Sequence, residues 1–215
     1  MFNFDLRETL LMLPAILFSL SLHEFCHAYA AVRLGDPTPA NQGRLTLNPI
    51  AHIDPIGFLL LLFAGFGWAK PVMINPLNFR NPRRDDIIVS VAGPASNMVT
   101  AAVFAVIMKV VIKLGIITLG PYGEVFYEIL NYFVWINLIL AFFNMIPIPP
   151  LDGSHILFAI LPQRFERWKE NFFRVGSILL IVIIMIENRT DLDILPIGKM
   201  AATVYKGFFH VLHIE

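Results

Sequence analysis

Two histidines and a glutamate form the pattern His-Glu-x-x-His at His23, Glu24 and His27, inside an apolar run that begins at Leu10. On a helix the two imidazoles project from nearly the same face, with the carboxylate about a quarter-turn round, so both can hold one metal ion. This is the layout of a hydrolytic zinc site, although on a soluble helix it equally describes a solvated face. In a segment that can enter a bilayer, each unpaired charge costs roughly 2.5 kcal/mol or more. The three residues therefore need partners, and a metal ion is the obvious one.

A third metal ligand must come from elsewhere, because catalytic zinc typically takes three protein ligands and one water. Asp152 fits best, since it is a lone carboxylate in the apolar, proline-rich stretch 146–153. Its alternative role is to cap the helix that follows. Glu128 is a poorer candidate near the far end of its helix. Cys26 is either a further ligand or a small apolar residue on the metal helix.

These ligands define a hydrolytic chemistry. Zinc lowers the pKa of a bound water toward 7, and Glu24 can accept the proton and return it to a leaving amine. Asn144 either stabilises the developing charge on the carbonyl oxygen or makes a structural hydrogen bond between helices. His52 either faces the cavity, where it contacts metal or substrate, or is a loop histidine held by Asp54.

The composition predicts a membrane protein that positions these residues within the bilayer. The 215 residues are 57% hydrophobic and 15% charged, with a formal net charge of zero. A soluble domain is rarely so apolar, and nucleic-acid binding would need clustered basic residues. The single cysteine excludes an intrachain disulfide. We expect one membrane-embedded domain over residues 1–215, with a core at 6–161 and C-terminal helices at 172–214.

The apolar runs predict an all-α polytopic bundle of about four to six transmembrane helices. Asn137 and Asn144 are a heptad apart and share a face, which should point inward. The stretch 195–214 either lies in the membrane interface or crosses once more. The other expected helices cover residues 6–34, 87–114, 124–145, 153–161 and 172–186.

The segment between the first two long helices has a different character. Residues 43–49 alternate like a short strand, and residues 73–76 are its expected partner in a β-hairpin. Residues 56–68 are apolar but too short to cross easily, which favours a re-entrant or interfacial segment. As a hypothesis, Leu45 and Leu47 lie on an edge where an unwound substrate pairs as an added strand.

Lysine and arginine are distributed unequally between the two ends of the expected helices. By the positive-inside rule the metal site opens toward the cytoplasm and the N-terminus lies outside. The connections on the Asp152 side hold Arg33, Arg44, Lys70, Arg80, Arg83, Arg84, Arg164, Arg167 and Lys169, and the opposite side holds Arg7, Lys113, Arg189 and Lys109.

The combined motifs resemble the site-2 protease family of intramembrane zinc metalloproteases, in particular its small bacterial and archaeal-type members without a PDZ or CBS domain. The resemblance implies one zinc ion on His23, His27 and Asp152, with Glu24 as the catalytic base. It also implies cleavage of transmembrane segments in membrane-spanning substrates. Besides the histidine motif, it is carried by Asn144-Met145-Ile146-Pro147, Pro150-Leu151-Asp152-Gly153, Gly93-Pro94-x-x-Asn97 and Gly43-Arg44-Leu45-Thr46-Leu47-Asn48-Pro49.

We assign His52, Leu45, Leu47 and Asn97 to substrate binding. A transmembrane substrate must unwind locally before its carbonyls can be attacked, which favours segments with glycine, proline or asparagine. The rival functions are a metal transporter and an inactive scaffold that binds helices without cutting them. Neither needs a carboxylate such as Glu24 beside the histidine pair.

Overall fold

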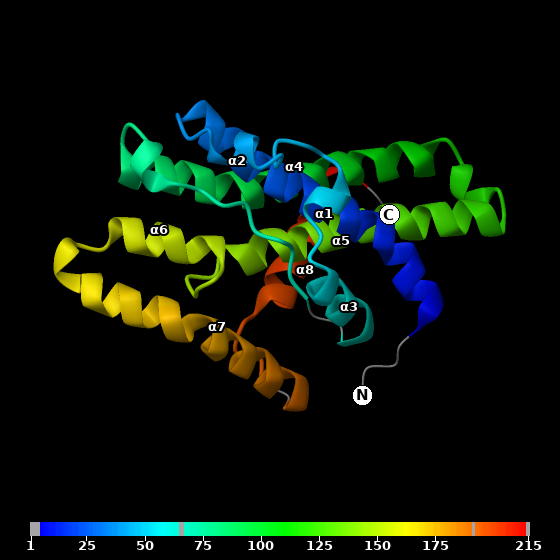
Figure 1. Cartoon of the computed structure of the whole chain (residues 1–215). Coiled ribbons are helices and arrows are strands. Elements are labelled where there is room, and N and C mark those ends of the chain that lie inside the picture. The colour runs from blue at the N-terminus through cyan, green and yellow to red at the C-terminus, as the bar shows by residue number, and fades with distance from the viewer. Residues whose placement is uncertain (1–4, 65–66, 191, 214–215) are drawn as a thin grey trace.

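The computed structural model describes residues 5–64, 67–190 and 192–213, and within these ranges it contains helices and no strand. Eight α-helices and four short 3₁₀ helices follow one another along the chain (Figure 1). Their bounds are α1 Leu6–Arg33, α2 Thr38–Asn41, η1 Pro49–Ala51, α3 Pro55–Ala64, η2 Pro76–Asn78, α4 Pro82–Lys113, η3 Ile116–Thr118, α5 Pro121–Asn144, α6 Asp152–Ile160, η4 Gln163–Phe165, α7 Glu166–Arg189 and α8 Ile197–Val211.

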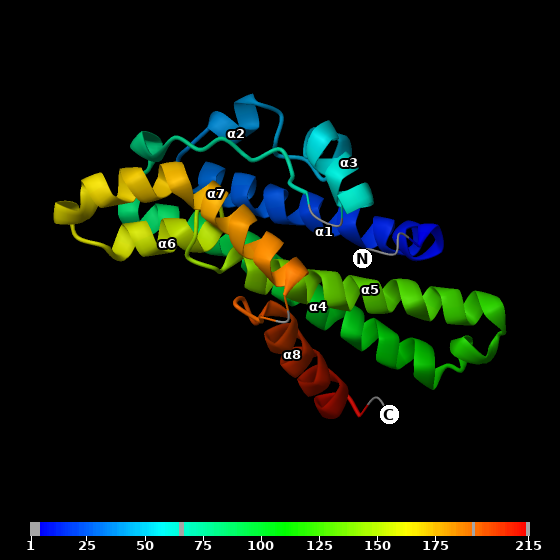
Figure 2. The same cartoon turned by 90° about the horizontal axis from the view of Figure 1, so that it is seen from below.

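Three of the described helices, α1, α4 and α5, are long and apolar enough to cross a membrane. Figure 2 shows α4 and α5 side by side and antiparallel, with α1 packed along them. The α4–α5 interface forms the main hydrophobic core around Ala105, Met108, Val134 and Leu138. The predicted all-α architecture is thus confirmed for the described residues, which contain three candidate membrane spans where four to six were expected.

Local capping explains where α1 and α4 begin. The Asp5 carboxylate accepts hydrogen bonds from the backbone N–H groups of Arg7 and Glu8, which fixes the first turn of α1. Pro82, at the first position of α4, has no backbone N–H that would need a hydrogen-bond acceptor. The backbone N–H of Asn81, just before α4, donates to the Asp85 carboxylate at 2.9 Å. As a result α4 begins at Pro82 rather than at the predicted residue 87.

The predicted β-hairpin is wrong. Residues 43–49 form no strand, because side chains rather than a partner strand satisfy the local backbone. The buried Arg44 guanidinium donates to the carbonyl oxygens of Ala51 and Lys70, and His52 Nε2 lies 2.8 Å from the carbonyl oxygen of Thr46. The antiparallel pairing that does form is a single bridge between Ile53 and Ala69, on either side of α3.

Helices α7 and α8 each pack against an earlier part of the chain. Gly176 of α7 lies against the ring of Pro149, in the connection that leads to Asp152. Helix α8 packs against α4 and α5, and the Tyr205 hydroxyl donates to Asn131 Oδ1 at 2.7 Å. The 15 residues of α8 rise about 22 Å, which is shorter than the roughly 30 Å hydrocarbon core. The predicted helix at 172–186 begins earlier, at Glu166.

Candidate metal centre

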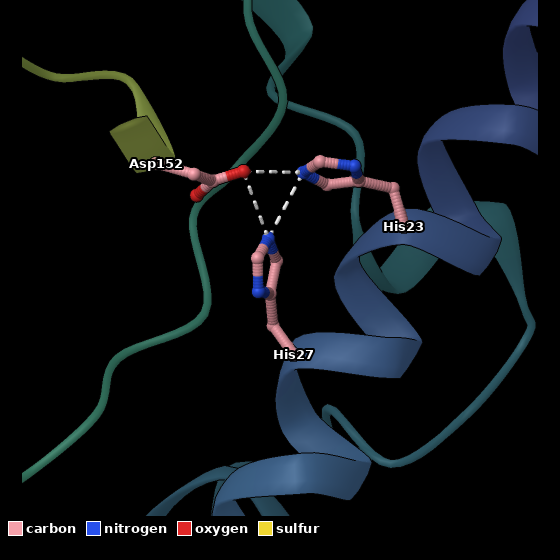
Figure 3. Close-up of side chains that lie close together, drawn as sticks. All are labelled: His23, His27 and Asp152. Carbon is pink, nitrogen blue, oxygen red and sulfur yellow. Dashed lines mark hydrogen bonds and ion pairs between the residues drawn. The ribbon is translucent and has the colours of Figure 1, made fainter. Parts of the chain in front are cut away.

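Two histidines of α1 and the first residue of α6 converge on one point inside the bundle (Figure 3). The Nε2 atoms of His23 and His27 are 2.9 Å apart. Asp152 Oδ2 lies 3.2 Å from His23 Nε2 and 3.3 Å from His27 Nε2. The structure therefore brings together all three residues that the sequence predicts as metal ligands.

The hydrogen bonds on the far side of each imidazole fix which nitrogen carries the proton. His23 Nδ1 lies 2.6 Å from Asn97 Oδ1, and His27 Nδ1 lies 2.7 Å from the carbonyl oxygen of Val89. Both partners are oxygen acceptors, so both Nδ1 atoms carry a proton and the two Nε2 atoms face one another and Asp152 Oδ2.

Two imidazole nitrogens and one carboxylate oxygen, each able to donate a lone pair to a metal ion, thus face one another at 2.9–3.3 Å. Asp152 Oδ2 is buried without a hydrogen-bond partner, which is costly for a carboxylate. A cation at the centre of the triangle removes this conflict. Two imidazole nitrogens and one carboxylate oxygen form a common donor set of catalytic zinc, with bonds of roughly 2.0–2.2 Å and a fourth position left for water. The residues present therefore fit a zinc ion.

Space for the two imidazoles comes from Gly93 on α4. A Cβ atom built on Gly93 would lie 2.5 Å from His23 Cε1 and 2.7 Å from His23 Nε2, and closer still to His27 Nε2. Such contacts are shorter than van der Waals separation, so no larger residue fits without displacement of the rings. The two predicted metal ligands are thus the groups that approach the backbone of α4 at Gly93.

Glu24 follows His23 on α1 and is half-buried. One carboxylate oxygen, Oε2, accepts a hydrogen bond from the backbone N–H of Val72 at 3.1 Å. This contact ties the proposed base to the segment before α4. Sequence reasoning missed Val72, because a backbone N–H contributes no residue-type signal.

The remaining predicted site residues lie outside the triangle of ligands. Asn144 ends α5, and its amide donates to the carbonyl oxygen of Leu140 in its own helix at 3.0 Å. His52 is buried, and its Nδ1 atom has no hydrogen-bond partner. The expected partner, Asp54, instead accepts from the backbone N–H of Gly57 at the start of α3.

The other predicted substrate-binding residues, Leu45, Leu47 and Asn97, differ in their exposure to solvent. Leu45 and Leu47 are exposed, whereas Asn97 is completely buried behind His23. Cys26 is half-buried and is not part of the three-ligand cluster. His155 is directed to α4, where its Nδ1 lies 3.5 Å from Asp86 Oδ2. The roles of Asn144, His52, Leu45, Leu47 and Asn97 stay predictions.

Comparison with known proteins also indicates a zinc metalloprotease. The family model for peptidase family M50 matches residues 121–186. The chain is 37% identical over 168 residues to "Putative zinc metalloprotease YwhC" of Bacillus subtilis, and the match covers 78% of this chain and 77% of the relative. Rip2 of Mycolicibacterium smegmatis, which carries the same description, is 29% identical over 183 residues, or 82% of this chain and 67% of the relative.

A third relative comes from an archaeon. MJ0611 of Methanocaldococcus jannaschii, again described as a zinc metalloprotease, is 28% identical over 72% of this chain and 73% of its own length. No solved structure matches the chain. The resemblance to the site-2 proteases is confirmed by these relatives. The chain belongs to peptidase family M50, a family of zinc metalloproteases.

Proposed function

We propose that the protein is an intramembrane zinc metalloprotease that hydrolyses peptide bonds within the transmembrane segments of membrane-anchored proteins. The observation that carries this proposal is the triangle of buried acceptor atoms on His23, His27 and Asp152. Two of these residues lie on α1, a candidate membrane span, so the reaction takes place within or close to the bilayer. One zinc ion per chain completes the site, within a single domain that extends over the whole sequence.

The bound zinc ion supplies a polarised carbonyl and an activated water. The chain's own residues supply the proton transfers and the orientation. Glu24 accepts the proton of the attacking water and gives it to the amine that leaves. The backbone N–H of Val72 holds the Glu24 carboxylate in place for both transfers. Asn144 donates a hydrogen bond to the carbonyl oxygen as it becomes negative, once its amide turns away from Leu140.

The substrate segment enters through a cavity of about 520 Å³ between α1, α3 and α5, whose lining does not include His23, Glu24, His27 or Asp152. Its walls are mostly apolar, as expected for a site that takes a transmembrane segment. The cavity is lined by Leu17 and Ser21 of α1, His52, Phe58 of α3, and Trp135 and Ile139 of α5. Leu45 and Leu47 then contact the part of the substrate that has unwound. The charge asymmetry of the sequence supports an opening of this site toward the cytoplasmic side of the membrane.

The decisive experiment replaces Glu24 by Gln in the detergent-solubilised full chain and follows both zinc content and cleavage of a single-span reporter substrate. We expect zinc binding to persist and the cleavage rate to fall about 10²–10⁴-fold, because the general base is lost. The matched control is Glu128→Gln, which removes an exposed ion pair with Arg7 far from the site. A Glu24→Gln variant that still cleaves at the wild-type rate would refute the proposal. A wild-type chain that binds zinc but never cleaves would favour a transporter or a scaffold.

A further inference from the structure

A network of buried amides connects the metal ligand His23 to the packing of three helices. Asn97 of α4 accepts from His23 Nδ1 through its Oδ1 and donates through its Nδ2 to Asn137 Oδ1 at 2.8 Å. Asn137 of α5 donates in turn to Ser19 Oγ at 2.6 Å and to the carbonyl oxygen of Phe133 at 2.7 Å. Asn97, Asn137 and Ser19, the amide network, are all 0% exposed.

Each link of the amide network determines the orientation of the next. The carbonyl oxygen of Phe133 can only accept, so the amide nitrogen of Asn137 must face it, and Asn137 Oδ1 must face Asn97. Asn97 is thereby forced to turn its nitrogen toward Asn137 and its oxygen toward His23. An oxygen at that position requires a proton on His23 Nδ1, which leaves the Nε2 lone pair free for a metal.

A reversed amide would have the opposite effect. If Asn97 turned over, its nitrogen would donate to His23 Nδ1, and the ring proton would move to Nε2. The reversal would also bring two amide oxygens, Asn97 Oδ1 and Asn137 Oδ1, face to face. In a buried site a lost hydrogen bond costs about 1–3 kcal/mol, so Asn137 strongly disfavours the reversed state.

The amide network also joins the two chain segments that supply the ligands. Ser19 lies one turn before His23 on α1, whereas Asn137 lies on α5, whose end leads through residues 145–151 to Asp152. The hydrogen bond between Asn137 and Ser19 therefore fixes how far α5 slides along α1. This register sets the separation between the imidazole pair and the carboxylate.

We propose that Asn97 and Asn137 are positioning residues for the metal site, and that Asn137 selects the metal-binding tautomer of His23 without touching it. The inference rests on the proposed zinc site but does not require proteolysis. It gives Asn97 a role other than the substrate contact that the sequence suggested. The same network makes metal affinity depend on the packing of α5 against α1 and α4.

The test uses Asn97→Leu and Asn137→Leu in the detergent-solubilised full chain. We expect both to weaken zinc binding about 10- to 100-fold, measured by competition with a chromogenic chelator. The Asn97→Asp variant keeps the acceptor for His23 Nδ1 but loses the donor to Asn137, so it should retain more zinc affinity than Asn97→Leu and less than wild type. The matched control is Asn131→Leu, which removes another amide of α5 whose partner is Tyr205. It should leave zinc affinity unchanged.

A second measurement reads the tautomer directly in the metal-free protein. The ¹⁵N spectrum of labelled histidine should show His23 with Nδ1 protonated in the wild type, and a population protonated at Nε2 after Asn137→Leu. Asn137→Ser is the milder variant if the leucine side chain prevents folding, and it should give an intermediate loss of zinc affinity. Wild-type zinc affinity and an unchanged tautomer in the Asn137 variants would overturn the proposal. Equal weakening by Asn131→Leu would do the same.

Discussion

The space occupied by the two imidazoles is created by a missing side chain on the neighbouring helix. Gly93 places the backbone of α4 directly against His23 and His27, and both rings are buried there. Glycine inside a helix normally costs about 1 kcal/mol relative to alanine. At this position the absence of a side chain is required, because a methyl group would overlap with both rings.

We therefore expect Gly93→Ala to weaken zinc binding rather than stabilise the helix. Overpacking costs about 1–3 kcal/mol, which corresponds to roughly a ten- to hundredfold loss if the imidazoles swing away from Asp152 to make room. Chelator competition measures this loss. The control is Gly207→Ala in α8, where an added Cβ meets nothing within 4 Å and zinc affinity should not change. Wild-type affinity in the Gly93→Ala variant would contradict the expected clash.

The ligands could be predicted from the sequence, but the groups that orient them could not. His23, Glu24 and His27 share one helical face by spacing alone, and Asp152 is a lone carboxylate in an apolar segment. The carbonyl of Val89 that holds His27 and the N–H of Val72 that holds Glu24 are backbone groups. Any residue type supplies them, so only the fold shows where they lie.

At the scale of elements, the segment from 36 to 81 shows why local patterns were less informative than the long helices. The alternation in residues 43–49 is typical of a strand, but a strand also needs free backbone groups and a partner. Here Pro49 begins a 3₁₀ helix, and the Thr46 carbonyl is taken by His52. The ends of α1, α4 and α5 were predicted to within five residues because the apolar runs of these helices are continuous.

Asp36 is the residue that connects the end of α1 to the segment before α4. Its carboxylate is buried and accepts hydrogen bonds from the backbone N–H and the hydroxyl of Thr38. It also accepts from the backbone N–H of Asn75 and from the side-chain amide of Asn78, each at 2.7 Å. Burial alone would raise the pKa of Asp36, but these hydrogen bonds outweigh it and lower the pKa below its ordinary value. The ionised form therefore stabilises the folded state.

We predict that Asp36→Ala lowers the free energy of unfolding by at least about 2 kcal/mol at neutral pH, since hydrogen bonds to a charged group are lost. Folding lowers the pKa of Asp36, so the stability that this carboxylate contributes is complete above the ordinary aspartate pKa of about 3.9. That stability is lost as the pH falls through the pKa of Asp36 in the folded state. The gap in thermal stability between wild type and variant should thus shrink on acidification. Melting curves in detergent at several pH values measure this gap, and a constant gap would argue against the assignment.

At the scale of the whole molecule, charge is distributed unevenly along the three long helices. Figures 1 and 2 both show the α4–α5 connection at the opposite end of the bundle from α6. Basic residues cluster at the α6 end, where Arg80, Arg83 and Arg84 precede or begin α4, whereas Arg7, Lys109 and Lys113 lie toward the other end. Translocating so many positive charges is unfavourable, so this end should remain in the cytoplasm.

Single-cysteine variants test this orientation in a Cys26→Ser background, which leaves the three-ligand cluster intact. We expect a membrane-impermeant maleimide to label a Leu119→Cys variant in intact cells, because Leu119 lies in the α4–α5 connection and is 69% exposed. A Gln42→Cys variant, exposed after α2, should react only when the membrane is permeabilised. The reverse pattern would place the metal site on the outer side. For the proposed protease, the orientation decides from which compartment water reaches Glu24 and into which compartment a fragment of the cut substrate is released.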